Sequence, residues 1–431
     1  MLNVTKNHYS YLVFGDLACF LAGLLFALMI RSGGLPRLVT LELHLFPFAI
    51  IFIIWITIFY IAGLYDLRTI VFRDTTIRQL INAQLVNSGV VILIFYFFPA
   101  FIIAPKTVLL FDLVITLVLL FLWRSLYVKS AVKIDREEAF IVGKSQVAQE
   151  LRDILEKMPH FGLSIVSGLS EYVGVIIVDF GDPNIESQMP ELYRRVFSGV
   201  RFLNLQEVYE QVTGRIPPEL ISERWVLENV SLQPKPIYTF FKRAMDIIIA
   251  LPLALTSLLY WPLIYLANKI EDGGSLFSHQ TRVGENDVPI HLLKLRTMSN
   301  PNDSGKWGNG NSNKTTKVGE FLRRSRLDEF PQLWNVVRGD LSLIGPRPEF
   351  PDPVGEYEQR IPYYKLRHII KPGLSGWAQI NQIENPHHSV DIELTRNKLS
   401  YDIYYIKNRS LFLDLKIALK TIKTLLSRVG A

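Results

Sequence analysis

Hydrophobic residues in the N-terminal part of the chain are grouped into long runs that contain almost no charge. The runs are Tyr9–Ile30, Leu45–Ala62, Gln79–Pro105 and Val108–Trp123, and only Asp16 and Asp112 interrupt them. A helix that crosses the hydrocarbon core of a bilayer needs about 20 mostly apolar residues. The pattern therefore predicts four transmembrane helices within residues 1–130.

The basic residues around these runs predict how the helices are oriented. Clusters of arginine and lysine follow the second run (Arg68, Arg73, Arg78) and the fourth run (Arg124, Lys129, Lys133, Arg136). The other two connections carry fewer basic residues. Because basic loops stay on the cytoplasmic side, we expect both termini in the cytoplasm.

Two acidic residues, Asp16 and Asp112, lie inside the predicted spans. Ionisable residues within a membrane are functional candidates by default. Both are near predicted helix ends, where a carboxylate can reach the interface, so a structural role is favoured. A proton-relay or transport role stays open at this point.

A different pattern covers residues 138–230, where short apolar runs alternate with amphipathic segments. Strands are expected at Ala139–Gly143, Leu163–Leu169, Val173–Phe180 and Arg201–Leu205, and helices at Ser145–Lys157 and Glu186–Phe197. This alternation is typical of a small Rossmann-like α/β domain with a parallel sheet.

The first predicted turn of this domain lacks a nucleotide fingerprint. Gly143-Lys144-Ser145 resembles the end of a phosphate-binding loop, but the position of that loop's first glycine holds Glu138. The repeated glycines of a dinucleotide-binding turn are also missing. We therefore expect a domain without a bound nucleotide, and its use in dimerisation or regulation stays open.

A fifth uncharged run, Ile247–Asn268, is long enough to cross a membrane. Lys242, Arg243 and Lys269 flank it, so both ends favour the cytoplasmic side. Pro252 and Pro262 each remove a backbone donor and kink a helix. The pattern predicts a re-entrant membrane helix over residues 243–270 that enters one leaflet, breaks and returns. A plain fifth span is the alternative.

The composition agrees with a membrane protein. Hydrophobic residues make up 49% of the chain and charged residues 20%, with a mean hydropathy of +0.22. The single cysteine excludes an internal disulfide and zinc or iron–sulfur sites built from several thiolates. The net charge of +6 suits a surface that faces anionic lipid or phosphate, and nucleic acid equally well.

An adjacent pair of acids, Asp328-Glu329, is the strongest candidate for chemistry. Arg323, Arg324 and Arg326 precede it, and the apolar segment that follows argues against a simple exposed helix face. Further along, Arg347 lies between two prolines. Guanidinium groups bind phosphate in a fork geometry, and carboxylates hold Mg²⁺ against substrate phosphates. This combination points to phosphoryl transfer.

Five stretches of the C-terminal half resemble the bacterial sugar transferases, the polyprenyl-phosphate hexose-1-phosphate transferases. They are Lys242–Asp246 (KRAMD), Leu293–Met298 (LKLRTM), Arg326–Val336 (RLDEFPQLWNV), Gly339–Pro348 (GDLSLIGPRP) and Lys371–Asn381 (KPGLSGWAQIN). The resemblance implies a catalytic domain over residues 238–431. The four-span front and the α/β domain resemble the larger members of the family.

The resemblance also implies the reaction. A hexose-1-phosphate would pass from a UDP-sugar to undecaprenyl phosphate, with release of UMP, as the first step of exopolysaccharide, capsule or O-antigen assembly. The sugar itself stays open. Expected partners are these two substrates and membrane lipid, with no nucleic acid, and a homodimer is possible.

The family pattern assigns roles to individual residues of this chain. Asp328 corresponds to the nucleophile that forms a sugar-phosphoryl intermediate, and Glu329 lies beside it at the metal or at acid–base steps. Asp328 and Glu329 would together hold Mg²⁺ or Mn²⁺. Lys294, Arg323 and Arg347 correspond to phosphate-contacting positions, and Pro262 to the break of the re-entrant helix.

Two other functions remain as alternatives. One is a membrane glycosyltransferase that moves the sugar without its phosphate and releases UDP. The other is a non-enzymatic four-span transporter or sensor with a cytosolic domain. Product identity separates the two enzymes, and the non-enzyme predicts no turnover at all.

Three weaker features are open to two interpretations. His368, His387 and His388 could suggest a metal site, but the pair His387-His388 has no matching Cys and no third ligand at helical spacing, so hydrogen-bonding or surface roles are expected. Ser299–Lys317, rich in Asn, Gly and Ser, is either a passive loop or a lid. Leu411–Arg428 is amphipathic, as expected for either an interfacial helix or a core-packing helix.

Overall fold

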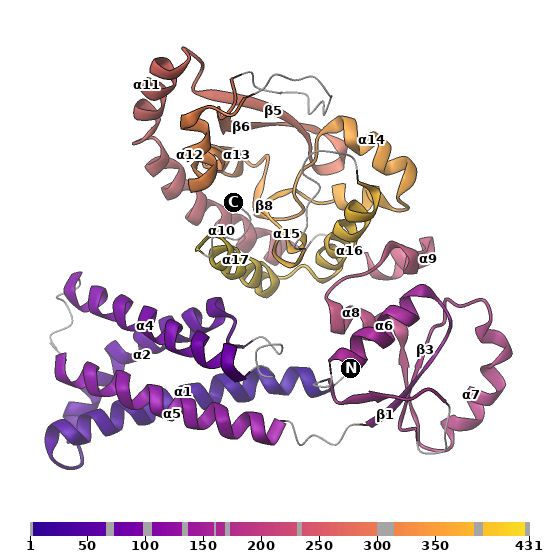
Figure 1. The fold of residues 1–431 in the computed structure, drawn as a ribbon, viewed down its shortest axis with the longest axis horizontal. Helices are drawn as coiled ribbons and strands as arrows, with labels where there is room; N and C mark the ends of the chain where they lie inside the picture. Colours follow the sequence, from indigo (N-terminus) through magenta and orange to yellow (C-terminus); the bar gives the residue numbers. More distant parts are fainter. Residues whose placement is uncertain are drawn as a thin grey trace. The chain divides into compact units, whose positions relative to one another are not determined.

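The computed structural model describes most of the chain. The described residues are 3–65, 73–97, 106–131, 137–158, 161–168, 173–230, 235–299, 314–382 and 391–426. They form two compact units, Met1–Val208 and Tyr209–Ala431, and each is described by itself. The chain is mostly helical, with small sheets in both units (Figure 1).

The first unit begins with four long helices. They are α1 (Asn3–Ser32), α2 (Leu38–Ala62), α4 (Arg73–Phe97) and α5 (Lys106–Ala131). Three of them contain segments that are long and apolar enough to cross a membrane, namely Ser10–Ser32, Leu38–Ala62 and Thr107–Tyr127. Three of the expected spans are thus helices of sufficient length and apolar character to cross a membrane.

The third expected span, Gln79–Pro105, is placed differently. Its helix α4 starts earlier, at Arg73, and its first half carries charged and amide side chains. Residues 98–105, the end of the apolar run, lie outside the described residues. The fourth span therefore stays a prediction, although α4 packs against α2 and α5 in the same bundle.

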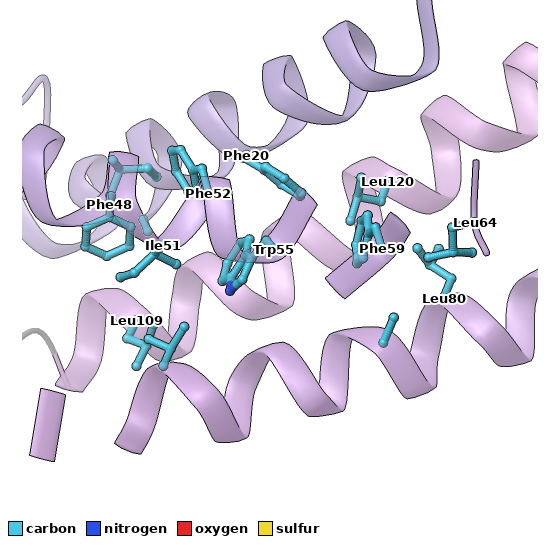
Figure 2. Packing of buried hydrophobic residues seen from close by; sticks show 14 of the residues in the cluster. Phe20, Phe48, Ile51, Phe52, Trp55, Phe59, Leu64, Leu80, Leu109 and Leu120 are labelled. Atoms are coloured by element: carbon cyan, nitrogen blue, oxygen red, sulfur yellow. The ribbon is translucent and has the colours of Figure 1, made fainter. Parts of the chain in front are cut away.

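Aromatic side chains fill the core of this helical bundle. Phe20 of α1 meets Phe52, Trp55 and Phe59 of α2, with ring centroids 5.5, 5.1 and 5.7 Å away (Figure 2). Helices α1 and α5 pack closely because Gly23 leaves room for a neighbour. A Cβ at Gly23 would lie 2.1 Å from the Thr116 hydroxyl. Small residues let membrane helices approach in this way.

Asp16 and Asp112 are fully buried in the bundle, so the expectation that they reach the interface is wrong. The Asp16 carboxylate pairs with Arg124, whose Nη2 lies 2.5 Å from Oδ2. Arg124 also donates to the Leu64 carbonyl at 2.6 Å. Asp112 accepts from Thr116 on its own helix. The pair between Asp16 and Arg124 joins α1 to α5, which gives Asp16 a structural role.

The first unit also contains the predicted parallel sheet. Its strands are β1 (Glu137–Val142), β2 (Leu163–Ile165), β3 (Val175–Val178) and β4 (Arg201–Asn204), in the order β2-β1-β3-β4. All three pairings are parallel. The helices around it are α6 (Gln146–Lys157), η2 (Ile185–Ser187) and α7 (Met189–Val196). The α/β expectation is confirmed.

The loop after β1 is occupied by two acids of the chain itself. Asp179 accepts from the Ser145 hydroxyl at 2.5 Å, and Asp182 accepts from the Lys144 backbone N–H at 2.8 Å. A phosphate bound at the start of α6 would need these same donors and would meet both carboxylates. We therefore still expect no nucleotide phosphate at this loop.

The second unit is built from many short elements. Its helices are η3 (Pro218–Leu220), α9 (Glu223–Asn229), α10 (Pro236–Ser257), α11 (Trp261–Glu271), η4 (Glu285–Asp287), α12 (Lys317–Ser325), η5 (Leu327–Glu329), α13 (Gln332–Arg338), α14 (Pro351–Arg360), η6 (Tyr364–His368), α15 (Trp377–Asn381), α16 (Ile392–Asn408) and α17 (Leu411–Leu426). Its strands form an antiparallel pair, β5 (Phe277–Val283) with β6 (Pro289–Leu295), and a parallel pair, β7 (Ser342–Ile344) with β8 (Gly373–Ser375). Helix α8 (Leu205–Thr213) contains the division between the units.

The segment 209–230 packs differently from the sequence-based assignment, which placed it with the α/β domain. Ile216, Ile221 and Trp225 share a hydrophobic cluster with Val354 and Tyr357 of α14. The apolar side chains of this segment are therefore buried against the second unit and not against the parallel sheet. Periodicity along the chain does not reveal which core an apolar side chain joins.

Helices α10 and α11 form one apolar pair that is bent by 48°. The bend lies at residues 258–260, and Pro262 is in the first turn of α11, where a proline costs no helical hydrogen bond. Leu259, Leu263 and Ile270 remain exposed at 78%, 69% and 79%. The bend fits either a broken span or a re-entrant helix.

The motif Lys242–Asp246 anchors the start of this bent pair to the rest of the unit. Arg243 donates to the carbonyls of Val336 and Val337 at the end of α13, at 2.6 and 2.7 Å. Asp246 accepts from the Leu343 backbone N–H in β7. These contacts tie the apolar helix to the two elements that follow the acid pair.

Helix α17 has one buried apolar face and one exposed apolar face. Leu413 and Ile417 are buried in a core cluster, whereas Phe412 and Leu415 are exposed at 69% and 51%. One face therefore packs within the unit, and a second apolar face remains uncovered by the described residues.

Candidate active site

The acid pair lies on a single helical turn that the preceding helix presents. Thr316 caps the start of helix α12, with its hydroxyl accepting from the Gly319 backbone N–H, and Arg326 caps the end of the helix. Arg326 has a left-handed backbone conformation with φ +56°, which is uncommon outside glycine. This sharp turn starts η5, and Asp328 and Glu329 follow directly beside β6.

Cationic side chains from two other elements converge on this pair. Lys294 of β6 lies 3.6 Å from Asp328 Oδ2 and 3.1 Å from Glu329 Oε1. Arg347, which follows β7, lies 2.6 Å from the same Glu329 oxygen. Residues far apart in the sequence thus meet, and four of the predicted site residues form one cluster.

Arg323, the other predicted phosphate contact, is placed at the edge of this cluster. It lies in the last turn of α12 and its Nε donates to the Thr297 hydroxyl at 3.1 Å. The side chain is exposed, and its charge acts on Asp328 without a direct hydrogen bond. It remains available to solvent and to an incoming anion.

The two neighbouring acids have opposite electrostatic environments. Asp328 is only 8% exposed, and burial raises its pKa above the ordinary aspartate value even though Lys294 and Arg323 act against this shift. Burial also opposes ionisation of Glu329, but Arg347 and Lys294 outweigh it and hold the pKa of that carboxyl well below its usual range. Such a divergence within one pair is typical of acids with different roles.

A second cluster of charges lies behind Arg347. Arg367 donates to the Arg347 backbone carbonyl at 2.8 Å and pairs with Asp402 at 3.0 Å. Glu349 accepts from Arg367 and from Lys398, which hold its pKa down at about 2 although burial opposes this. These contacts fix the backbone that presents the Arg347 guanidinium.

Sequence reasoning missed this second cluster almost entirely. Only Glu349, two residues after Arg347, offered a signal through its closeness to a motif. Arg367, Lys398 and Asp402 lie on helices where charged residues normally face solvent, and no spacing marks them as partners.

The acid pair provides oxygen ligands of the kind that Mg²⁺ prefers. Glu329 Oε1 already accepts from Lys294 and Arg347, so an ion held there would rely on Asp328, on Glu329 Oε2, on water and on substrate oxygens. The residues fit a magnesium ion that keeps several waters.

A second group with metal ligands surrounds His368, but its geometry favours hydrogen bonding. Asp287, Glu358 and His368 bring their ligand atoms within 4.8 Å of one another. His368 Nδ1 lies 2.6 Å from Asp287, and the Lys365 ammonium lies 3.4 Å from Glu358. A cation of the chain thus already accompanies these acids. His387 and His388 lie outside the described residues, as does most of the Ser299–Lys317 segment.

Comparison with known proteins adds independent information. Residues 237–428 match the family described as bacterial sugar transferase. The chain is 36% identical over 262 residues to a UDP-N-acetylgalactosamine-undecaprenyl-phosphate N-acetylgalactosaminephosphotransferase of Aeromonas hydrophila, covering 59% of this chain and 60% of that protein. The match therefore spans less than two thirds of this relative's length.

Two further relatives carry a different sugar in their names. A UDP-glucose:undecaprenyl-phosphate glucose-1-phosphate transferase of Caulobacter vibrioides is 39% identical over 203 residues, covering 46% of this chain and 74% of that protein. The protein of the same name from Escherichia coli is 39% identical over 186 residues, covering 42% of this chain and 39% of that protein.

Proposed function

The chain belongs to the bacterial sugar transferase family, and we propose that it transfers a hexose-1-phosphate from a UDP-sugar to undecaprenyl phosphate with release of UMP. The observation that carries the proposal is the buried Asp328 beside an ionised Glu329, with Lys294 and Arg347 converging on the pair. The relatives' names mention two different sugars, so the sugar of this chain stays open.

In the first half-reaction, an Asp328 oxygen attacks the phosphorus that carries the sugar. The bond from this phosphorus to the bridging oxygen breaks, and its electron pair leaves with UMP. Lys294 and Arg347 exchange contacts with Glu329 for contacts with phosphate oxygens, which offsets the repulsion between two anions. Asp328 meets the phosphorus with little bound water because it is buried.

In the second half-reaction, an oxygen of undecaprenyl phosphate attacks the same phosphorus. The acyl-phosphate bond breaks, and Asp328 returns to its carboxylate form. The attacking phosphate is already ionised, so little general-base help is needed. A Mg²⁺ ion held by Asp328 and Glu329 would supply further screening of the phosphate charges.

The identity of the nucleotide product tests this function. Purified full-length protein is incubated with undecaprenyl phosphate and a panel of UDP-sugars, and the released nucleotide is separated by chromatography. We expect UMP and a lipid diphosphate sugar with at least one UDP-sugar. Release of UDP would favour the glycosyltransferase alternative, and no turnover with any sugar would favour the transporter or sensor.

We expect this activity to depend on a divalent cation. Chelation with EDTA should abolish UMP release, and added Mg²⁺ or Mn²⁺ should restore it, because two phosphates and two carboxylates come together at one point. Calcium, which tolerates longer and less regular coordination, serves as the comparison ion. Full turnover after exhaustive chelation would contradict a metal held by Asp328 and Glu329.

The proposed reaction also requires a particular placement of the chain in the membrane. Four N-terminal spans, completed by α4, would leave the second unit on the cytoplasmic face of the bacterial inner membrane, where UDP-sugars are found. The bent pair of α10 and α11 would then enter one leaflet and return, with Pro262 just after the break. This keeps Asp328 at the boundary between lipid and water.

Cysteine labelling tests this re-entrant placement. In a variant with Cys19 replaced by alanine, Lys235→Cys and Ser275→Cys introduce one label site on either side of the bent pair, both at exposed positions. We expect an impermeant thiol reagent to label both sites in inverted membrane vesicles and neither in intact cells. Labelling of Ser275→Cys in intact cells would show a complete crossing.

A further inference from the structure

Arg282 of β5 is a cation beside the candidate active site that no motif and no step above uses. Its guanidinium carbon lies 3.3 Å from the centre of the Phe350 ring. Nη1 donates to the Pro348 carbonyl at 3.2 Å, and Nη2 donates to Gln280 Oε1 at 2.9 Å. These contacts place Arg282 against the segment that follows Arg347.

Arg282 makes no ion pair within the part of the chain that the structure describes. Its two hydrogen bonds go to uncharged oxygens, and its buried Nε has no acceptor there. Glu349 and Glu329 act on its charge only through space, so the lost hydration of this partly buried guanidinium is not replaced by a direct ion pair. An arginine in this situation suits an anion that comes from outside the chain.

The nearby acids are already bound to other cations. Glu329 accepts from Lys294 and Arg347, and Glu349 accepts from Arg367 and Lys398. Burial, and after it the positive charge of Arg347, lower the pKa of Arg282 to about 10, although Glu349 and Glu329 act in the opposite direction. Two like charges held this near each other mark a position where an anion would be stabilised by both.

We propose that Arg282 binds the phosphate group of the departing UMP. This inference rests on the proposed function and extends it to a residue outside the family motifs quoted above. Among the described residues, Lys294 pairs with both acids of the site, Arg347 pairs with Glu329 but not Asp328, and Arg282 pairs with neither. If the sugar-linked phosphorus lies at Asp328 beside Lys294, we assign the second phosphate of the diphosphate to Arg282, which lies against the segment after Arg347.

The chemistry at that second phosphate explains why a guanidinium is useful there. When Asp328 attacks the sugar-linked phosphorus, the bond to the bridging oxygen breaks and its electron pair stays on the UMP phosphate. That phosphate gains one negative charge as the bond breaks. A cation in contact with it stabilises the departing group more than the intact substrate, and such differential binding accelerates the step.

The two half-reactions separate this role from a structural one. UMP exchange is measured from the transfer of labelled UMP into UDP-sugar without a lipid acceptor, and it involves the leaving phosphate. The second half-reaction is measured by adding undecaprenyl phosphate to sugar-phosphoryl enzyme freed of UMP. This half-reaction does not involve the leaving phosphate. The variants are Arg282→Gln and Arg282→Lys in the full-length protein. Arg360→Gln is the control, because Arg360 is exposed on α14 and its ion pair among the described residues is with Glu356.

We expect Arg282→Gln to lower the rate of UMP exchange about 100-fold, as for loss of one preorganised donor to a developing charge. UMP should also inhibit the Arg282→Gln variant at least 10-fold more weakly than the unmodified protein. The rate of transfer to the lipid should stay within twofold of that of the unmodified protein. Arg282→Lys keeps the positive charge but loses the fork geometry of the guanidinium. Its rate of UMP exchange should lie between those of Arg282→Gln and the unmodified protein.

Three results would overturn the assignment of Arg282. They are unchanged inhibition by UMP, equal losses in both half-reactions, and an Arg282→Gln protein that cannot be purified folded while Arg282→Lys exchanges UMP normally. If the unmodified protein itself exchanged UDP instead of UMP, the proposed function would fail before any variant was compared.

Discussion

Replacing Asp328 by asparagine is expected to reduce UMP release by at least about 10⁴-fold, as for loss of a nucleophile. Asparagine keeps the size and the burial of the side chain but has no carboxylate to attack phosphorus. Lys294, Glu329 and Arg347 would still bind the diphosphate, so the apparent affinity for the UDP-sugar should change far less than the rate. Steady-state kinetics with the preferred sugar measure both quantities.

The same substitution should leave stability intact or improve it. Burial raises the pKa of Asp328 in the folded protein, so the folded state holds its proton more tightly than the unfolded state. Stability therefore falls as pH rises from the unfolded value, about 3.9, through the raised folded value. Above that window the ionised carboxylate destabilises the fold, and asparagine removes this cost. Thermal unfolding at neutral pH provides the comparison.

Asp352→Asn is the matched control, because Asp352 is exposed on α14. It should change neither turnover nor thermal stability. A fully active Asp328→Asn would remove Asp328 as the nucleophile. An inactive variant with a strongly lowered unfolding temperature would show that Asp328 supports the fold and would leave its chemical role unsupported.

Lys294→Met is expected to have the second largest effect, a loss of about 10² to 10³ in kcat/KM, which is typical for one donor to a developing anion. Lys294 contacts both acids and lies where the sugar-linked phosphate must bind. Methionine preserves the length of the side chain without its charge. Lys365→Met, at an exposed ion pair on η6, is the control and should retain activity.

The pH dependence gives this variant a second readout. Lys294 lowers the pKa of Asp328 against the effect of burial, so its removal raises that pKa further. Because attack requires the ionised carboxylate, the acid limb of kcat/KM should move to higher pH in Lys294→Met. An unchanged acid limb would indicate that Asp328 is not the group that titrates.

Motifs in the sequence indicated the candidate site because its residues lie in short stretches with distinctive chemistry. The adjacent acids and the proline-flanked Arg347 were visible as residues. Their meeting with Lys294 was predicted only through the family resemblance. Arg282 and Arg367 were not found, since each depends on contacts with carbonyls and rings that no spacing along the chain encodes.

The fold was predictable where a pattern repeats along one element. Three apolar helices and the four parallel strands follow directly from runs of hydrophobic residues. Contacts between distant segments were not predictable in this way. The pair between Asp16 and Arg124 joins two helices from opposite ends of the bundle sequence, and Trp225 packs in the second unit although a continuous pattern placed it with the first.

The most direct test of the account uses a UDP-sugar labelled at the sugar-linked phosphate, mixed with the protein in the absence of undecaprenyl phosphate. We expect a burst of one UMP per active protein molecule, with the label retained on the peptide that contains Asp328 and lost when undecaprenyl phosphate is added. Release of labelled UDP, or a burst of UMP without any label on the protein, would contradict a covalent transfer through Asp328.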